Sequence, residues 1–304
     1  MADEMINGYY DKRTMYVPMP EMHDEMIPVT QGCSYNKCLY CDLNQRKFSV
    51  YDIEEIKKFI RERADFYKDK KFVPKKFNLL EGNPLSLKTN FLIEVMQEIN
   101  KNFDSVKFIS MFARSDDVLR KSDEELLRLK ANGMDRLCIG VESGCDEVLK
   151  FHQKGVTSED QLRALKKLER LEINYSCYIM LGLGGVKYSE KHIDDTIEFL
   201  NKTKPFEIAV VNMVVFRKAR LVEKIRNGEF ERISIRRQIE EEIKLIDGLT
   251  IDAIYTGTHK TKSLSITSKL PEGKELLIEK LEEHLKLDDR TLTDLERFKW
   301  THKG

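Results

Sequence analysis

Three of the six cysteines lie within nine residues of one another, at Cys33, Cys38 and Cys41. Thiolates are soft ligands that suit iron–sulfur clusters and zinc. Three thiolates on one loop can bind three irons of a cubane cluster and leave the fourth iron with an open coordination position. Because an open position on a metal is typical of a catalytic site, this spacing predicts a reactive metal centre.

Two other interpretations of these cysteines are open. The same three thiolates could hold zinc with a distant fourth ligand such as His23, although structural zinc sites usually pair two cysteines with two much later ligands. Cysteines can also be small buried hydrophobes, but a loop that contains glycine and asparagine is a poor place for a core. The remaining cysteines are scattered and are expected to pack in the interior: Cys138, Cys145 and Cys177.

Six short apolar runs alternate with amphipathic segments along the chain and would position such a loop. The runs are rich in β-branched or aromatic residues, which is typical of buried strands. Between them apolar residues recur at helical spacing, and Ser122 with Glu125 forms a capping box. This alternation predicts an α/β fold, a partial parallel barrel of the TIM-barrel type with six strand–helix units. The expected strands are 27–30, 77–80, 106–109, 137–141, 178–181 and 208–211.

The alternation breaks after about residue 215. We expect an N-terminal arm at 1–25, the barrel core at 26–215 and an α-rich C-terminal extension at 216–304 that packs on the barrel. The extension should contain a charged helix at 235–249, a strand near 253–255 and two helices after Pro271. Because no repeat or Gly/Ser/Pro-rich linker interrupts the chain, one compact unit is expected.

Composition limits the kinds of partner. The 304 residues contain 52 Lys+Arg and 52 Asp+Glu, so the formal net charge is zero. Zero charge argues against partners bound mainly by bulk electrostatics, such as duplex DNA or an anionic membrane. No run approaches 18 apolar residues, and the first ten residues lack the basic region of a secretory signal. We therefore expect a cytoplasmic protein with no membrane partner and no strong nucleic-acid signal.

The segment GCSYNKCLYC, from Gly32 to Cys41, resembles the cluster loop of the radical S-adenosylmethionine (SAM) superfamily. Members of that superfamily bind a [4Fe–4S] cluster through three cysteines after the first barrel strand. Their usual spacing has three residues and then two between the cysteines, whereas this chain has four and then two. An aromatic residue before the last cysteine, here Tyr40, fits the pattern. The resemblance implies that Cys33, Cys38 and Cys41 hold the cluster.

Polar or glycine-containing motifs follow each later strand, at the ends where parallel sheets bind ligands. The resemblance covers about residues 25–215 and implies that these motifs bind SAM. Arg114 could pair with the carboxylate of SAM through its guanidinium. The other implied contacts are Glu81, Gly82 and Asn83 to the amino group, Glu142 to the ribose, Ser143 to the carboxylate, and Met180, Gly182 and Asn212 to the adenine, with Tyr40 beside the cluster.

A radical SAM enzyme is therefore the expected function. The resemblance implies that a reduced cluster donates one electron to SAM and that the resulting 5′-deoxyadenosyl radical abstracts hydrogen from a substrate. It also implies an electron donor such as a flavodoxin or ferredoxin. The alternative is a non-catalytic iron–sulfur or zinc-binding protein.

The substrate is not identified by these motifs, and no catalytic residue is assigned. The resemblance leans toward the branch that contains coproporphyrinogen oxidases and methylthiotransferases. Asp42 follows Cys41 where those oxidases have a further cysteine, which argues against a porphyrinogen substrate.

Overall fold

Two compact units make up the chain in the computed structural model. Unit 1 comprises residues 1–36 and 43–138, and unit 2 comprises residues 37–42 and 139–304. The expectation of one compact unit, with an arm, a core and an extension, stays a prediction. The expected boundary at 215/216 falls inside unit 2. The residues that the structure describes are 25–42, 47–70, 73–259 and 261–301, so the N-terminal arm expected at 1–25 lies outside them except for Glu25.

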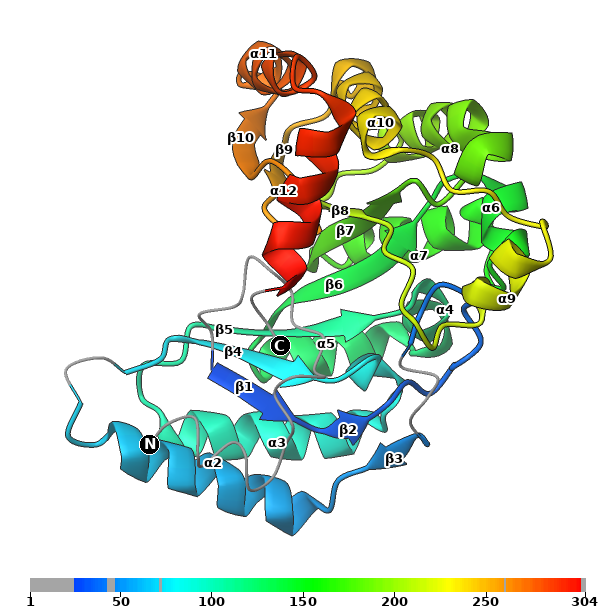
Figure 1. Cartoon of the computed structure of the whole chain (residues 1–304). Helices are drawn as coiled ribbons and strands as arrows, with labels where there is room; N and C mark the ends of the chain where they lie inside the picture. The colour runs from blue at the N-terminus through cyan, green and yellow to red at the C-terminus, as the bar shows by residue number, and fades with distance from the viewer. Residues whose placement is uncertain (1–24, 43–46, 71–72, 260, 302–304) are drawn as a thin grey trace. The chain divides into compact units, whose positions relative to one another are not determined.

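Unit 1 is built on three parallel strands with helices packed beside them. Strand β4 (Lys76–Leu80) pairs with β1 (Glu25–Pro28) and with β5 (Phe108–Ala113), and Leu79 lies opposite both Ile27 and Met111. The two longest helices of the unit, α2 (Ile53–Tyr67) and α3 (Thr89–Asn102), lie side by side in Figure 1. The other elements between the strands are β2 (Thr30–Gln31), β3 (Ser49–Val50), the 3₁₀ turn η4 (Pro84–Ser86), α4 (Ser115–Arg120) and α5 (Asp123–Ala131).

Local sequence explains where the helices of unit 1 begin. Asp52 accepts the backbone amides of Glu54 and Glu55 and so caps α2. The capping box expected from Ser122 and Glu125 is present at the start of α5. The apolar stripes of α2 and α3 are buried, as their helical spacing predicts.

Unit 2 also has parallel strands, joined by helices. Strand β8 (Glu207–Asn212) pairs in parallel with β7 (Asn174–Leu181) and with β9 (Ala253–Gly257), and β10 (Ile266–Leu270) runs antiparallel to β9. Strand β6 (Met134–Glu142) begins in unit 1 and ends in unit 2. The helices are α6 (Asp146–Phe151), α7 (Ser158–Arg170), α8 (Gly185–Leu200), α9 (Leu221–Arg226), α10 (Ile235–Gly248), α11 (Lys274–His284) and α12 (Asp289–Thr301).

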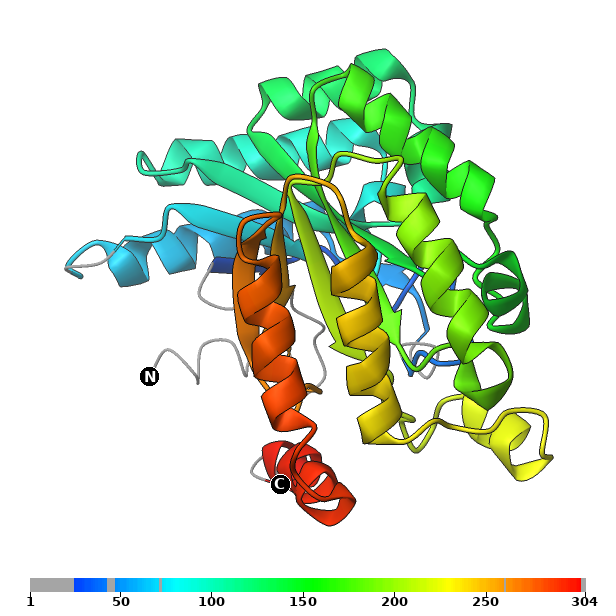
Figure 2. The same cartoon turned by 90° about the horizontal axis from the view of Figure 1, so that it is seen from above.

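The expected α/β fold class is confirmed. Each of the six expected strands overlaps with an observed one, and the paired neighbours β1, β4 and β5, and β7 and β8, are parallel. The strand expected near 253–255 is β9, and the two helices expected after Pro271 are α11 and α12. In Figure 2, α10 (yellow) and α11 (orange) lie side by side. Within the described part of the chain, no helix is long and apolar enough to cross a membrane.

Candidate active site

Of the three loop cysteines, Cys33 belongs to unit 1, whereas Cys38 and Cys41 belong to unit 2. All three are half-buried and none is in a disulfide. Cys138, Cys145 and Cys177 are buried, as expected for packing residues. Three partly accessible thiols on one loop are a donor set that fits an iron–sulfur cluster. His23, the zinc ligand considered above, lies outside the described residues.

In unit 1, the turn after β4 anchors the residues that flank the first cysteine. The Gly32 amide donates to Glu81 Oε2 at 2.6 Å. Asn83 Nδ2 donates to Ser34 Oγ at 2.9 Å and to Asp117 Oδ2 at 2.5 Å. Glu81 and Asn83 are buried. Because their side chains bond to Gly32 and Ser34, they hold this part of the loop in place. Asp117, on α4, was not anticipated from the sequence because it acts through Asn83.

Arg114 is buried at the end of β5 and is not a surface arginine. Its guanidinium carbon lies 3.6 Å from the ring centroid of Tyr35, in the cysteine loop, and its Nε donates to Asp116 at 2.9 Å. A guanidinium stacked on an aromatic face gains a cation–π attraction that increases with desolvation. Arg114 therefore braces the loop in unit 1, and its pairing with the SAM carboxylate stays a prediction.

In unit 2, a buried lysine joins two of the expected site residues. Lys154 Nζ donates to Glu142 Oε1 at 3.0 Å and to the Tyr40 hydroxyl at 3.3 Å. Lys154 is only 5% exposed. Burial, and then the neighbouring Cys38 and Glu142, raise the pKa of Tyr40 well above its usual value, so the phenol stays protonated. Sequence reasoning missed Lys154, since a lysine in a turn before Gly155 carries no distinctive signal.

His152 supports the second half of the cysteine loop. Its carbonyl accepts the Leu39 amide at 3.0 Å, and its ring meets the Tyr40 ring edge-on at 5.6 Å. Its Nε2 donates to the Leu183 carbonyl at 2.8 Å. Leu39 and Tyr40, which separate Cys38 from the last cysteine, are both buried in an apolar cluster of unit 2. The residues between these two cysteines therefore act as core residues that fix the loop.

Ser143 is fully buried, and its hydroxyl is engaged within the protein. The Ser143 hydroxyl lies 2.8 Å from His192 Nδ1, and His192 Nε2 lies 3.1 Å from the Met180 carbonyl. Because a carbonyl can only accept, Nε2 carries the proton and Nδ1 accepts from Ser143. The hydroxyl also accepts the Cys145 amide at 3.0 Å. In this arrangement Ser143 links β6 to α8, and nothing in it supports the expected contact with the SAM carboxylate.

The turn after β7 has its backbone groups bonded internally. The Met180 carbonyl accepts from His192, and the Gly182 carbonyl accepts the Gly185 amide at 3.1 Å. The Gly182 amide donates to Glu241 Oε2 at 2.6 Å. The adenine contacts expected here are therefore more consistent with van der Waals packing than with these backbone groups.

Two buried amide oxygens near the strand ends lack a hydrogen-bond partner among the described residues: Asn83 Oδ1 after β4 and Asn212 Oδ1 at the end of β8. Buried acceptors are nearly always satisfied, so a bound ligand with a suitable donor could complete each of them. SAM carries such donors in its amino group and in the amino group of its adenine. Both asparagines are among the residues expected to bind SAM. Their unsatisfied oxygens are suitable acceptors for the two amino groups of SAM.

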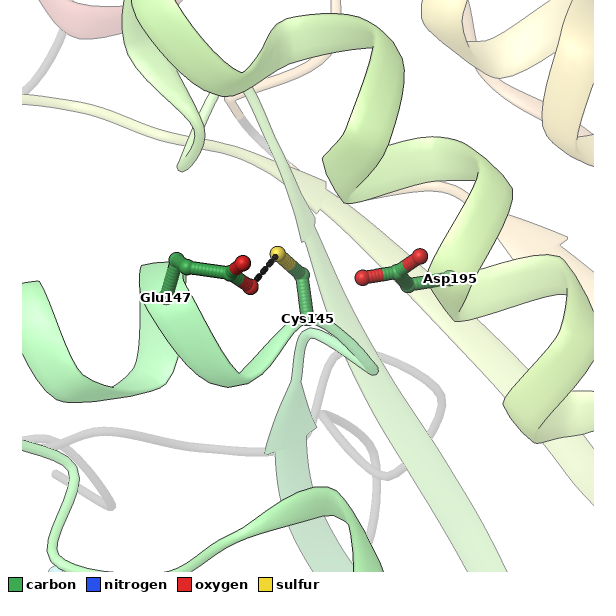
Figure 3. Close-up of side chains that lie close together, drawn as sticks. All are labelled: Cys145, Glu147 and Asp195. Atoms are coloured by element: carbon green, nitrogen blue, oxygen red, sulfur yellow. Dashed lines mark hydrogen bonds between the residues drawn. The ribbon is translucent and has the colours of Figure 1, made fainter.

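A second group of side chains that could bind a metal consists of a cysteine and two carboxylates. Figure 3 shows Cys145 with Glu147 and Asp195, and the thiol donates to Glu147 at 3.3 Å. Burial raises the pKa of the Cys145 thiol to about 12. The Lys191 ammonium lies 3.3 Å from Glu147 and 2.5 Å from Asp195, which partly balances the charge of the two carboxylates. Cys145 is therefore a protonated packing residue, as the sequence predicts.

Two buried histidines make stability depend on pH. Burial lowers the pKa of His152 and of His192 to about 4, because the charged imidazolium is disfavoured there. In the unfolded chain both pKa values return to about 6.5. The stability that their neutral forms contribute is complete above the unfolded value and is lost as the pH falls through the folded value. Glu241 opposes them, since burial raises the pKa of its carboxyl to about 7.

We expect the free energy of unfolding of the apoprotein to fall between pH 7 and pH 5. Each histidine contributes a loss of about 2 kcal/mol, and Glu241 offsets about the same amount, leaving a net loss of about 2 kcal/mol. Urea denaturation at the two pH values measures this difference. Glu241→Gln should steepen the loss, since it removes the opposing group. A stability that is flat or rises on acidification would contradict the assignment of both histidines as buried and neutral.

Known proteins that resemble this chain are found by sequence. A family model described as the Radical SAM superfamily matches residues 27–200. Among curated proteins, the chain is similar to 4′-phospho-dehydrooxetanocin synthase of Priestia megaterium, with 26% identity over 206 residues. That match covers 60% of this chain and 27% of the relative, so the chain spans about a quarter of the relative's length.

Solved structures share the fold. The archaeal Elp3 of Methanocaldococcus infernus superposes with a TM-score of 0.57 and 15% identity, over 86% of this chain and 63% of that one. The Escherichia coli coproporphyrinogen III oxidase HemN gives a TM-score of 0.56 and 16% identity, over 73% of this chain and 51% of that one. At such identities the likeness concerns the fold alone.

Proposed function

The chain belongs to the radical SAM superfamily, and on that premise we propose that it binds a [4Fe–4S] cluster at Cys33, Cys38 and Cys41 and cleaves SAM reductively. Enzymatic activity follows from the family. The observation that carries the finer proposal is the cysteine loop, whose three thiols are half-buried, outside any disulfide and flanked by anchored residues. When bound, the cluster would supply the electron that cleaves SAM.

Positive charge in each unit suits the carboxylate of SAM. In unit 2, Lys154 is a buried ammonium that pairs with Glu142 Oε1. A second anion in reach would share that ammonium, and Glu142 Oε2 would still accept a ribose hydroxyl. In unit 1, Arg114 is the corresponding buried cation. We assign Lys154 as the residue that pairs with the carboxylate of SAM, and Arg114 is the alternative.

The remaining residues would hold SAM and keep water away. Asn83 Oδ1 would accept the amino group and Asn212 Oδ1 the adenine amino group, since both are buried acceptors that lack partners among the described residues. The half-buried Met180 would contribute apolar contact. Tyr40 stays protonated and keeps its hydroxyl next to Lys154. The substrate and the electron donor are not assigned by these contacts.

Anaerobic reconstitution tests the proposal. The wild-type protein should be brown, contain about four irons per chain and form 5′-deoxyadenosine from SAM when dithionite is added. Iron analysis and chromatographic detection of 5′-deoxyadenosine measure the two properties. A colourless protein that holds zinc would contradict the proposal, and a brown protein that neither binds nor cleaves SAM would instead indicate an electron-transfer protein.

A further inference from the structure

Helix α10, in the C-terminal extension, buries two consecutive carboxylates, Glu241 at 3% exposure and Glu242 at 0%. Burial of a carboxylate is costly unless its charge is balanced or well hydrogen-bonded. Glu242 is balanced, because it pairs with the buried Lys262 ammonium and accepts the Tyr255 hydroxyl at 2.7 Å. Among the described residues Glu241 forms no salt bridge, so another interaction must account for its burial.

The hydrogen bonds of Glu241 are made to the turn after β7 and the helix that follows it. Its Oε2 accepts the Gly182 amide at 2.6 Å, and its Oε1 accepts the Ser189 hydroxyl at 2.7 Å. Both donors are neutral. An ionised acceptor shortens and strengthens such a bond, so Glu241 is a firm attachment point for the Gly182 amide.

Gly182 has an unusual backbone conformation and little space around it. Its φ of 78° lies in the left-handed region that favours glycine. The side chain of Gln238, also on α10, fills the adjacent space, and a Cβ on Gly182 would lie 3.2 Å from it. If the carboxylate were absent, the buried Gly182 amide would lose its partner, and the turn would have to move to satisfy it.

We propose that Glu241 is a positioning residue for SAM, which holds the turn after β7 in the shape that contacts the adenine. The inference rests on the proposed function, because Met180 and Gly182 are the expected adenine contacts. It gives the C-terminal extension a part in cofactor binding: the extension contributes through α10 a side chain on which the cofactor-binding turn depends.

Two variants separate the acceptor from the charge. Glu241→Leu fills the site with apolar volume and removes the acceptor, whereas Glu241→Gln keeps an oxygen for the Gly182 amide. Burial raises the pKa of Glu241 to about 7, and in both protonation states one oxygen accepts that amide, so glutamine is a fair substitute. Glu240→Gln is the matched control, since its side chain is on the same helix, is partly exposed and pairs with Arg237 instead of with the turn after β7.

Anaerobic calorimetry with SAM and hydrogen exchange of the Gly182 amide are the measurements. We expect Glu241→Leu to weaken SAM binding about tenfold and to speed exchange at Gly182 by a similar factor. Glu241→Gln and Glu240→Gln should stay within about twofold of wild type by both measurements. If Glu241→Leu does not fold, Glu241→Asn replaces it, because its shorter amide cannot reach Gly182, and the same loss is expected.

The possible failures are distinguishable. If the wild type binds SAM and Glu241→Leu binds it equally well, the positioning role is wrong. The same holds if Glu241→Gln is as weak as Glu241→Leu, since the acceptor would then not be the cause. If the wild type itself does not bind SAM, the proposed function fails, whereas Gly182 exchange still reports whether Glu241 holds the turn.

Discussion

Replacing Cys38 with alanine is expected to abolish SAM cleavage, lowering 5′-deoxyadenosine formation by about a thousandfold or more, equivalent to about 4 kcal/mol of activation free energy. A cubane cluster with a single open iron needs all three protein thiolates. The alanine variant can offer only two, and the cluster would be lost or unable to hold SAM. The measurements are iron content and the rate of 5′-deoxyadenosine formation under dithionite.

Cys145→Ala is the matched control for this variant. Cys145 lies beside the Glu142–Gly144 motif, but its thiol is buried and its pKa is raised to about 12, so it cannot readily form a thiolate ligand. We expect Cys145→Ala to retain the iron content of the wild type and most of its activity. Loss of iron in both variants would point to unfolding, and retained activity in Cys38→Ala would refute the ligand assignment.

Replacing Lys154 with methionine should weaken SAM binding by about 10- to 100-fold, since a hydrogen bond to a charged group contributes about 1.5–3 kcal/mol. Methionine keeps the length of the side chain but removes the ammonium. The variant should also lose stability, because Glu142 would be left without its partner. Calorimetric titration with SAM and chemical denaturation measure the two effects.

A double variant separates binding from stability. Adding Glu142→Gln to Lys154→Met removes the unpaired carboxylate, so stability should recover while the carboxylate of SAM still lacks its cation. Lys150→Met is the control, because Lys150 is exposed on the neighbouring helix α6. If Lys154→Met binds SAM as tightly as wild type, the carboxylate belongs to Arg114 or to another group, and the assignment of Lys154 is wrong.

Sequence reasoning predicted the strands and helices, whereas the contacts that it expected with SAM stay predictions. The strands are short apolar runs and the helices are amphipathic, so local periodicity was enough to place β1 and β4 to β8. The capping box at Ser122 is equally local. The two compact sets of residues are defined by tertiary contacts, which local periodicity does not record.

The residues that sequence reasoning missed all act through partners distant in the chain. Lys154 bonds to Tyr40, 114 residues away, and Glu241 bonds to Gly182, 59 residues away. Neither residue type is unusual for the surface of a helix or a turn, so the sequence carries no mark of its burial. Ser143 shows the converse: a polar residue in an expected ligand motif is fully buried and bonded to His192.

The sequence by itself determined the α/β fold class and the donor chemistry of Cys33, Cys38 and Cys41, because periodicity and thiol spacing are properties of short segments. Only the tertiary structure decided which buried groups are satisfied. Lys154 shares its ammonium between Glu142 and Tyr40, and Asn83 and Asn212 keep an acceptor that lacks a partner among the described residues. Whether a buried polar group is satisfied depends on what folding places beside it, and no local pattern records that.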